Sequence, residues 1–238
     1  MHKLLDLNSP LMRALSRMTD LVFLSVLWFV CCLPVFTIGP ATAAMCFVAM
    51  KLAKKDEIRV VPTFFQSFKI NFKQGIVLNL IFMAVGAILA LDMIYFGAEE
   101  LGTGTGITWL RAVILAMGAW ALCIMFYAYP LQAQFYNPIR RTLRNAAILA
   151  MQKPINTVIV FLLNMFPAIF IYVSVNVFQD LTLFVRSLPV WILLVPGVLA
   201  YLCGKRFVKL FDPYLNPKED SEKTEEDAED EEDTEDEE

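Results

Sequence analysis

The sequence is poor in the residues that most often carry out catalysis or bind metal ions. Its one histidine, His2, stands near the N-terminus, so a catalytic triad with histidine and a metal site with histidine ligands are nearly excluded. The five cysteines lie in apolar stretches and form no Cys-X-X-Cys motif, so each is expected to act as a small buried apolar residue. Because no nucleophile–base pair and no metal-ligand cluster stands out, we expect no enzymatic activity and no cofactor.

Charged residues are scarce over long stretches, and apolar residues take their place. Hydrophobic residues make up 58% of the 238 residues, more than the share usual in soluble domains. They gather in runs near the length of about 20 residues that a membrane helix needs. The predicted fold is therefore all-α: a polytopic helical membrane protein with five to six membrane segments in a domain of residues 1–216. The segments are expected at about residues 21–37, 40–55, 76–97, 107–130, 155–178 and 188–204.

The charges that are present separate into a basic body and an acidic tail. Of the 24 acidic residues, 15 lie between Glu219 and Glu238, whereas 18 of the 20 basic residues lie before residue 218. The tail, residues 217–238, is too acidic and too poor in apolar residues to bury a core. We therefore expect it to be disordered.

One stretch decides on which side of the membrane the N-terminus lies. Residues 21–53 form an apolar run that is interrupted by Pro34 and by Gly39-Pro40. If the run crosses once, the protein has five spans and the N-terminal basic residues lie outside. If it turns back near residues 37–41, there are six crossings or half-crossings and these residues lie inside. The positive-inside rule favours the turn, and a single crossing stays open.

The connecting segments differ in basic residues in an alternating way. Residues 51–74 contain six and residues 137–154 contain four, whereas residues 97–106 contain none and residues 179–187 contain one. Basic residues near span ends mark the cytoplasmic side. The sequence thus predicts a multi-pass protein of the cell membrane with both termini in the cytoplasm.

Two of the basic connections are expected to form amphipathic helices that make a cytoplasmic interface, and the first of them either lies at the membrane interface or packs under the bundle. In residues 63–74, three phenylalanines spaced four apart share one helix face and two lysines share another: Phe64, Phe68, Phe72, Lys69 and Lys73. The second helix carries Arg140, Arg141 and Arg144. The flanking spans argue against an aromatic platform for nucleic acid, so no nucleic-acid partner is expected. The basic residues could bind anionic lipid, a partner or the acidic tail, or only orient the protein.

Polar residues inside the predicted spans are the remaining candidates for function. Asp92 and Arg111 each lie four or five residues inside the external end of a span, which is roughly 6–8 Å deep. Such charges are costly unless they are paired or face water, so we expect an intramembrane polar pair, either as a structural salt bridge or as the lining of a path. Asn79, Gln132 and Asn164 are expected to bond across helices, and Pro130, Pro167 and Pro196 to kink them.

The order of three motifs resembles the YesL family of bacterial membrane proteins. The motifs are LNSPLMRALSRMTDLVFLSVLWFVCCLPVFTIGPATAA, FFQSFKINFKQG and RRTLRNA, and the resemblance covers about residues 5–214, without the tail. Members of that family are often encoded beside sugar-uptake transporters, and their activity is uncharacterised. The resemblance implies an accessory factor for carbohydrate uptake, with the lipid bilayer and a sugar-transporter component as partners. A small secondary transporter or channel is the alternative.

Overall fold

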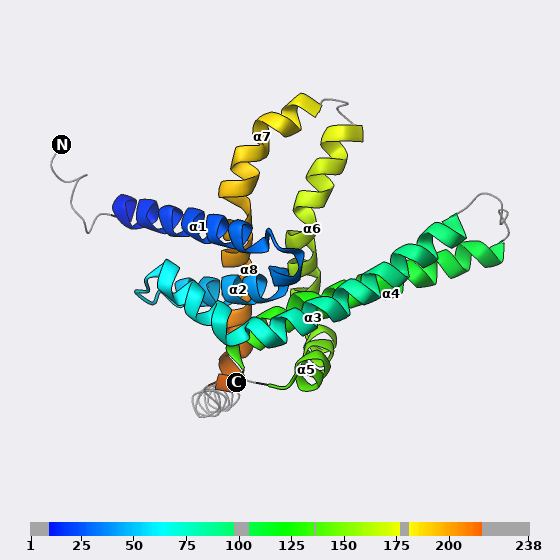
Figure 1. Cartoon of the computed structure of the whole chain (residues 1–238), viewed down its shortest axis with the longest axis horizontal. Coiled ribbons are helices and arrows are strands. Elements are labelled where there is room, and N and C mark those ends of the chain that lie inside the picture. Colours follow the sequence, from blue (N-terminus) through cyan, green and yellow to red (C-terminus); the bar gives the residue numbers. More distant parts are fainter. Residues whose placement is uncertain (1–9, 98–104, 136, 177–180, 216–238) are drawn as a thin grey trace, which may run out of the picture.

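The structure, a computed structural model, describes residues 10–97, 105–135, 137–176 and 181–215. In these residues the chain forms helices joined by short connections, and no strand (Figure 1). Six stretches are long and apolar enough to cross a membrane, which confirms the predicted class of fold. In chain order the elements are α1 (Pro10–Cys32), η2 (Val35–Thr37), α2 (Ile38–Ala53), α3 (Val60–Gly97), α4 (Thr105–Gln134), α5 (Ile139–Gln152), α6 (Pro154–Asn176), α7 (Leu181–Leu193) and α8 (Val195–Leu215).

The predicted acidic tail lies outside the described residues, so its disorder and the domain boundary before it stay predictions. The loop at residues 97–106 is likewise described only at its ends.

The break between α1 and α2 lies a few residues earlier than the sequence predicted. Pro34 is extended, with φ −77° and ψ 119°, and the hydroxyl of Thr37 donates to the carbonyls of Cys31 and Pro34, both at 2.6 Å. The expected turn at residues 37–41 is wrong because Gly39-Pro40 fits in the first turn of α2. There a proline costs no helical hydrogen bond, since the first N–H groups of a helix have no partner.

The chain turns back on itself at this break. In Figure 1, α2 runs back beside α1, and the indole N–H of Trp28 donates to the hydroxyl of Thr42 at 3.2 Å across the two helices. Leu24 is fully buried in one cluster with Ala44 and Val48. The favoured turn of residues 21–53 is therefore present in the fold, and its sidedness in a membrane stays a prediction.

Helix α2 is the centre of the molecule. In its candidate span 61% of the residues are buried, against 11–22% in the other five spans. It contacts α1, α3, α4 and α8. Its buried face is built mainly from small residues: Gly39, Ala41, Ala43, Ala44 and Ala49. Small side chains let neighbouring helices come close, which favours association inside a membrane, where lipid is as apolar as the side chains.

Two of these crossings leave no room for a side chain. A Cβ on Gly39 would collide with the carbonyl oxygen of Gly75 on α3, and a Cβ on Gly75 would lie 2.7 Å from the backbone nitrogen of Pro40. At the other crossing, a Cβ on Gly204 of α8 would lie 3.0 Å from the backbone of Ala49. Close backbone contact on both sides therefore fixes α2 between α3 and α8.

Helix α3 joins two segments that the sequence separated. The predicted interfacial helix at residues 63–74 and the span at 76–97 form one helix of 38 residues, which is about 57 Å long. Its first half lies against α2. Its second half pairs with the first half of α4 and extends away from the centre as an arm (Figure 1). We call this pair the first arm.

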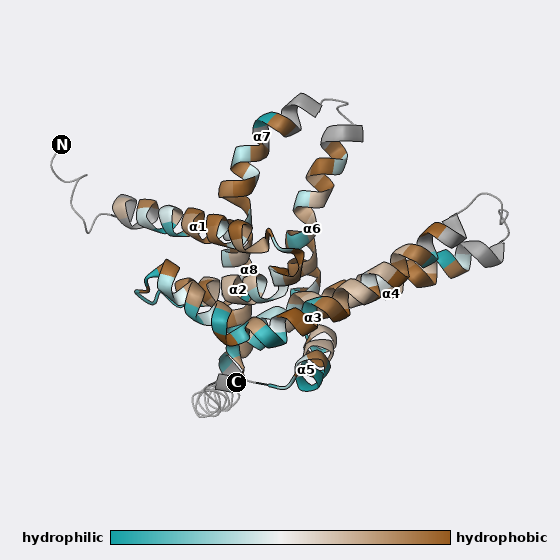
Figure 2. Cartoon of the chain, viewed as in Figure 1, coloured by the Kyte–Doolittle hydropathy of each residue, from teal (hydrophilic) through white to brown (hydrophobic). Residues whose placement is uncertain are grey.

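A second arm consists of α6 and α7, with Trp191 of α7 stacked between Phe166 and Phe170 of α6 at ring-centroid distances of 6.0 and 4.6 Å. The predicted last segment, residues 188–204, is divided between α7 and α8. Figure 2 shows apolar residues along both arms and polar residues in α5 and around the connection from α2 to α3.

The close crossing at Gly75 gives the first prediction. The change Gly75→Ala should lower the free energy of unfolding by about 1–3 kcal/mol, because the new methyl group meets backbone atoms of Pro40 that cannot move aside. Gly86→Ala on the same helix is the matched control, since a Cβ there has nothing within 4 Å. Melting in detergent measures both, and equal effects would show that the Gly75 crossing is not tight.

Candidate functional site

A cavity of about 440 Å³ lies where the central helices meet. Side chains of α1, α2, α3, α4, α6, α7 and α8 line it, and Asp, Glu, Lys and Arg are absent from these described residues. The wall is mostly apolar and aromatic, with a few polar groups: Trp28, Thr42, Asn79, Tyr129 and Asn164. Ligand sites commonly have this size and this mixture of apolar wall and few polar groups. The cavity suits a small uncharged molecule.

The three prolines noted in the sequence all line this cavity. Pro130 lies inside α4, Pro167 lies inside α6, and Pro196 lies in the first turn of α8. A proline inside a helix removes the backbone donor for the carbonyl four residues earlier. In α4 and α6 those carbonyls belong to Phe126 and Leu163. Kinked helices of this kind are tolerated in membranes where they surround a cavity or are held by neighbours.

Asn79 lines the cavity and forms a hydrogen bond to the break between α1 and α2. Its amide Nδ2 donates to the carbonyl of Val35 at 3.1 Å, and the hydroxyl of Tyr129 lies 3.5 Å from its Oδ1. Both Asn79 and Tyr129 are buried. One side chain of α3 thus links η2 and α4, as expected for a polar residue that bonds across helices.

Gln132 also bonds across helices, as expected, whereas Asn164 bonds mainly within its own helix. Asn164 donates within α6 to the carbonyl of Val160 at 2.8 Å, and its contact with another helix is the sulfur of Cys203 at 3.5 Å. The Nε2 of Gln132 donates to the carbonyl of Asn71 on α3 at 3.4 Å. The Oε1 of Gln132 is buried without a hydrogen-bond partner in the described part of the chain.

Sequence reasoning missed the residues that hold the α5–α6 junction near the cavity. The hydroxyl of Thr157 donates to the carbonyl of Ala150 at 2.9 Å and lies 3.0 Å from the hydroxyl of Tyr127, which is fully buried. Neither residue stands out in the sequence, because a threonine and a tyrosine in apolar runs give no periodic signal. Tyr129 and Trp28, which line the cavity, likewise have no distinguishing signal in the sequence.

The predicted interface residues of α3 fall on two faces. Phe64 is fully buried, while Phe68 and Phe72 are half-buried, with ring centroids 6.2 Å and 5.5 Å apart along the helix. Lys69 and Lys73 are exposed. The aromatic face therefore packs inside the molecule and the lysines face outward. Their role as an interface stays a prediction.

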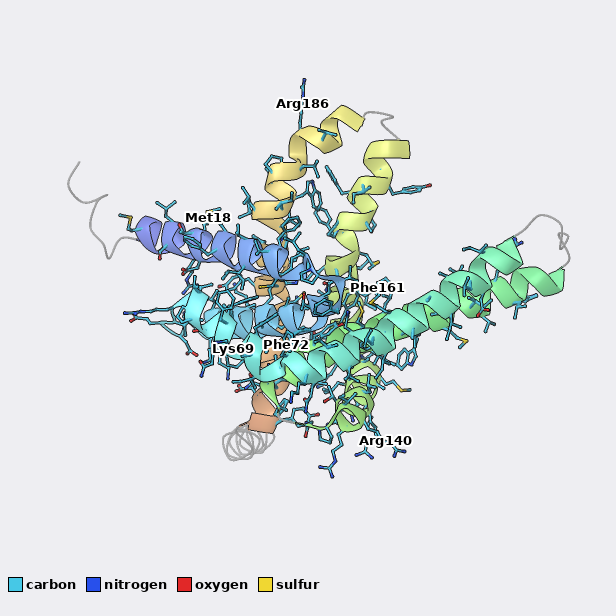
Figure 3. The ribbon with its side chains drawn as sticks, viewed as in Figure 1. Met18, Lys69, Phe72, Arg140, Phe161 and Arg186 are labelled. Carbon is cyan, nitrogen blue, oxygen red and sulfur yellow. The ribbon has the colours of Figure 1, made fainter. Side chains whose placement is uncertain are left out.

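The predicted interface residues of α5 lie on its open face. Arg140, Arg141 and Arg144 are exposed, and Figure 3 shows Arg140 at the lower edge of the molecule. The opposite face is buried through Thr142, Ala146, Leu149 and Ala150. Helix α5 is thus amphipathic, as expected from its sequence.

Asp92 and Arg111 lie on the first arm, away from the central cavity. Asp92 is on α3, Arg111 is on α4, and both are half-buried. The two helices pack side by side. Their energetic coupling stays a prediction, to be measured by a double-mutant cycle with Asp92→Asn and Arg111→Gln.

Comparison with known proteins places the chain beside uncharacterised relatives. A family model described as "Protein of unknown function, DUF624" matches residues 21–93. The "Uncharacterized protein YesV" of Bacillus subtilis (strain 168) is 26% identical over 120 residues, which cover 50% of this chain and 56% of YesV. The chain therefore matches about half the length of this relative. No solved structure matches. These similarities agree with the predicted YesL-type family, and neither name states an activity.

The hydrogen bond of Asn79 gives the second prediction. The change Asn79→Ala should lower the free energy of unfolding by about 0.5–1.5 kcal/mol, because it removes the bond to Val35 across the helices. Asn164→Ala is the control, since Asn164 bonds mainly to its own helix. Thermal melting in detergent tests this, and a larger loss for Asn164→Ala would contradict the role given to Asn79.

Proposed function

We propose that this protein is a non-enzymatic accessory factor that docks on the membrane helices of a transporter for carbohydrate uptake. The observation that carries the proposal is the uncovered apolar surface of the first arm. Ile88, Leu91 and Ile94 of α3 are 59%, 66% and 72% exposed, and Trp109 of α4 is 75% exposed. In a membrane such a surface faces either lipid or another helix.

Small residues on the same arm favour another helix over lipid. Gly86 and Ala90 are four residues apart on α3 and both exposed, and a Cβ on Gly86 would meet nothing within 4 Å. Ala112 and Ala116 repeat this spacing on α4. Pairs of small residues four apart let two membrane helices approach closely and are typical of helix–helix interfaces. Within the described residues, no other helix covers Gly86.

A hollow beside Gly86 offers room for side chains of the partner. It has a volume of about 470 Å³ and lies between α3, α4 and α6, with apolar residues on its walls. Phe161 of α6 closes it near the crossing of the two arms (Figure 3). An apolar helix that packs on Gly86 and Ala90 could fill this space with its own side chains.

The carbohydrate part of the proposal rests on the resemblance to the YesL family. The substrate of the transporter would be bound by the partner, and this protein would stabilise or regulate its membrane helices.

The small-residue pair on α3 gives the third prediction. The double change Gly86→Ile and Ala90→Ile should abolish co-purification of a carbohydrate transporter's membrane subunit from native membranes, because added branches prevent close approach. The melting temperature should change little, since Gly86 borders open space. Ala168→Ile adds the same bulk to an exposed position on α6 and should keep the partner. Recovery of the transporter subunit with both variants would contradict the docking surface.

A small transporter for an uncharged solute is the second candidate, and the central cavity favours it. Broken helices around a cavity near the middle of the bundle are a feature of many transporters. The discriminating measurement is uptake of labelled neutral sugars by liposomes that contain only this protein. Flux that falls when Ala200→Phe fills the cavity would support this second function and argue against a purely accessory role.

We also propose that the protein lies in the cell membrane with both termini in the cytoplasm. Six candidate spans are an even number, so the two ends share one side, and the basic residues place that side in the cytoplasm. Phosphatase fusions at Met1 and after Pro217 should both be inactive, and fluorescent-protein fusions at both positions should fluoresce. An active phosphatase at Met1 alone would show an odd number of crossings.

A further inference from the structure

A polar hollow lies at the C-terminal end of α8, beside the start of α6. We call it the basic pocket; its volume is about 260 Å³. It is formed by the junction of α5 with α6 and by the last turns of α8 (Figure 1). Its lining residues are Lys153, Asn156, Arg206, Lys209, Leu210 and Tyr214.

Three positive charges meet in this pocket without a negative charge among the lining residues. Lys153, Arg206 and Lys209 are exposed, and none of them forms an ion pair with a residue in the described part of the chain. Asp212, on the same helix, is exposed and does not line the pocket. Like charges so close together repel each other, and a bound anion removes that repulsion. The pocket is therefore an anion site by its charge.

The start of α6 contributes the positive end of a helix dipole to the pocket, whereas the ends of α5 and α8 contribute carbonyl groups. The pocket borders the first turn of α6, whose first intrahelical bond runs from the N–H of Thr157 to the carbonyl of Lys153 at 3.0 Å. The N–H groups of Ile155 and Asn156 come before that bond and have no acceptor within the helix. Helix N-termini attract phosphate for this reason. The hydroxyl of Thr157, bonded to Ala150 at 2.9 Å, holds the turn between α5 and α6 in place.

The position of the pocket along the spans indicates the source of the anion. The candidate span Pro154–Val173 begins at the pocket, and the apolar part of Leu188–Asp212 ends there. Ile155 and Met151, beside Lys153, are 78% and 69% exposed. An exposed apolar surface that borders a cluster of basic residues is typical of the boundary between the acyl chains and the headgroups. A dissolved anion would make no use of that apolar border.

We propose that the basic pocket binds the phosphate of an anionic phospholipid in the adjoining leaflet. Lys153, Arg206 and Lys209 hold the phosphate, while the acyl chains lie against Ile155 and Met151. Basic pockets between membrane helices are a known way to bind such headgroups. The acidic tail follows α8 directly and is the main competing occupant. The lipid is favoured because it matches the apolar border of the pocket as well as its charge.

The test uses the purified full-length protein in a neutral detergent. Phosphatidylglycerol and phosphatidylcholine are titrated separately, and both the melting temperature and the lipid retained in native mass spectrometry are measured. The site variant carries K153Q, R206Q and K209Q. The matched control carries K54Q, K55Q and R59Q, which removes the same charges from exposed positions elsewhere. A conservative variant, K153R with K209R, keeps the charge and shows whether folding tolerates changes in the pocket.

We expect phosphatidylglycerol to bind and stabilise the wild type, the control and the conservative variant more than phosphatidylcholine does. The site variant should bind phosphatidylglycerol roughly a hundredfold more weakly, which corresponds to about a factor of five for each basic residue removed. Its response to phosphatidylcholine should not change.

Three results would overturn the proposal. The first is an equal loss in the site and control variants, which would mean attraction by overall charge. The second is the same stabilisation by millimolar inorganic phosphate, which would identify a soluble ligand. The third is that the wild type shows no preference for phosphatidylglycerol. In that case, a lower melting temperature of the site variant in lipid-free detergent would identify the acidic tail as the occupant.

Discussion

The structure depends on backbone contact between α2 and its neighbours. Gly39 meets Gly75 of α3, and Ala49 meets Gly204 of α8, at distances that exclude larger side chains. Apolar side chains gain little by leaving lipid for a protein interface, so close packing and polar bonds must supply what the hydrophobic effect supplies in water. These contacts explain why α2 is far more buried than the other candidate spans although it is one of the shortest. The central cavity and the base of the first arm both lie against this helix.

The same physics explains where the polar residues lie. A buried amide or hydroxyl without a partner is costly in an apolar environment, and most of those described here have one. Asn79 bonds to Val35, Thr157 bonds to Ala150, and the hydroxyl of Thr37 bonds to carbonyls of Cys31 and Pro34 at the end of α1. The Oε1 of Gln132 is the exception, buried without a partner in the described residues. The central cavity lies between Asn79 and the three prolines, in space that side chains do not fill.

The sequence predicted the helices better than the contacts between them. Length and hydropathy give the helices, and the pair Pro34 and Gly39-Pro40 gives a break, because proline chemistry is local. The exact position of the break depended on Thr37. Its hydroxyl bonds to the carbonyl of Cys31 at the end of α1, and α2 begins at the next residue, Ile38. The continuity of α3 was missed because Gly75 and the basic residues beside it look like a boundary, whereas contact with Pro40 is what requires that glycine. The sequence left open whether the face of Phe64 meets the membrane interface or packs under the bundle, since amphipathic spacing alone cannot distinguish a lipid from a neighbouring helix; in the structure Phe64 is buried.

The length of α3 constrains where the turn of the α1–α2 hairpin lies relative to the bilayer. A hydrocarbon core of about 30 Å holds about 20 helical residues, whereas α3 has 38. The part of α3 beyond Asn79 forms the first arm and is close to that length. The hairpin turn meets α3 at Gly75 and Asn79, where the arm begins. If the arm spans the bilayer, the turn lies near the interface from which the arm starts and does not reach the far side. Because α2 runs back beside α1, the start of α1 and the α2–α3 connection then lie on the same side of the bilayer, for a geometric reason that is independent of any count of basic residues.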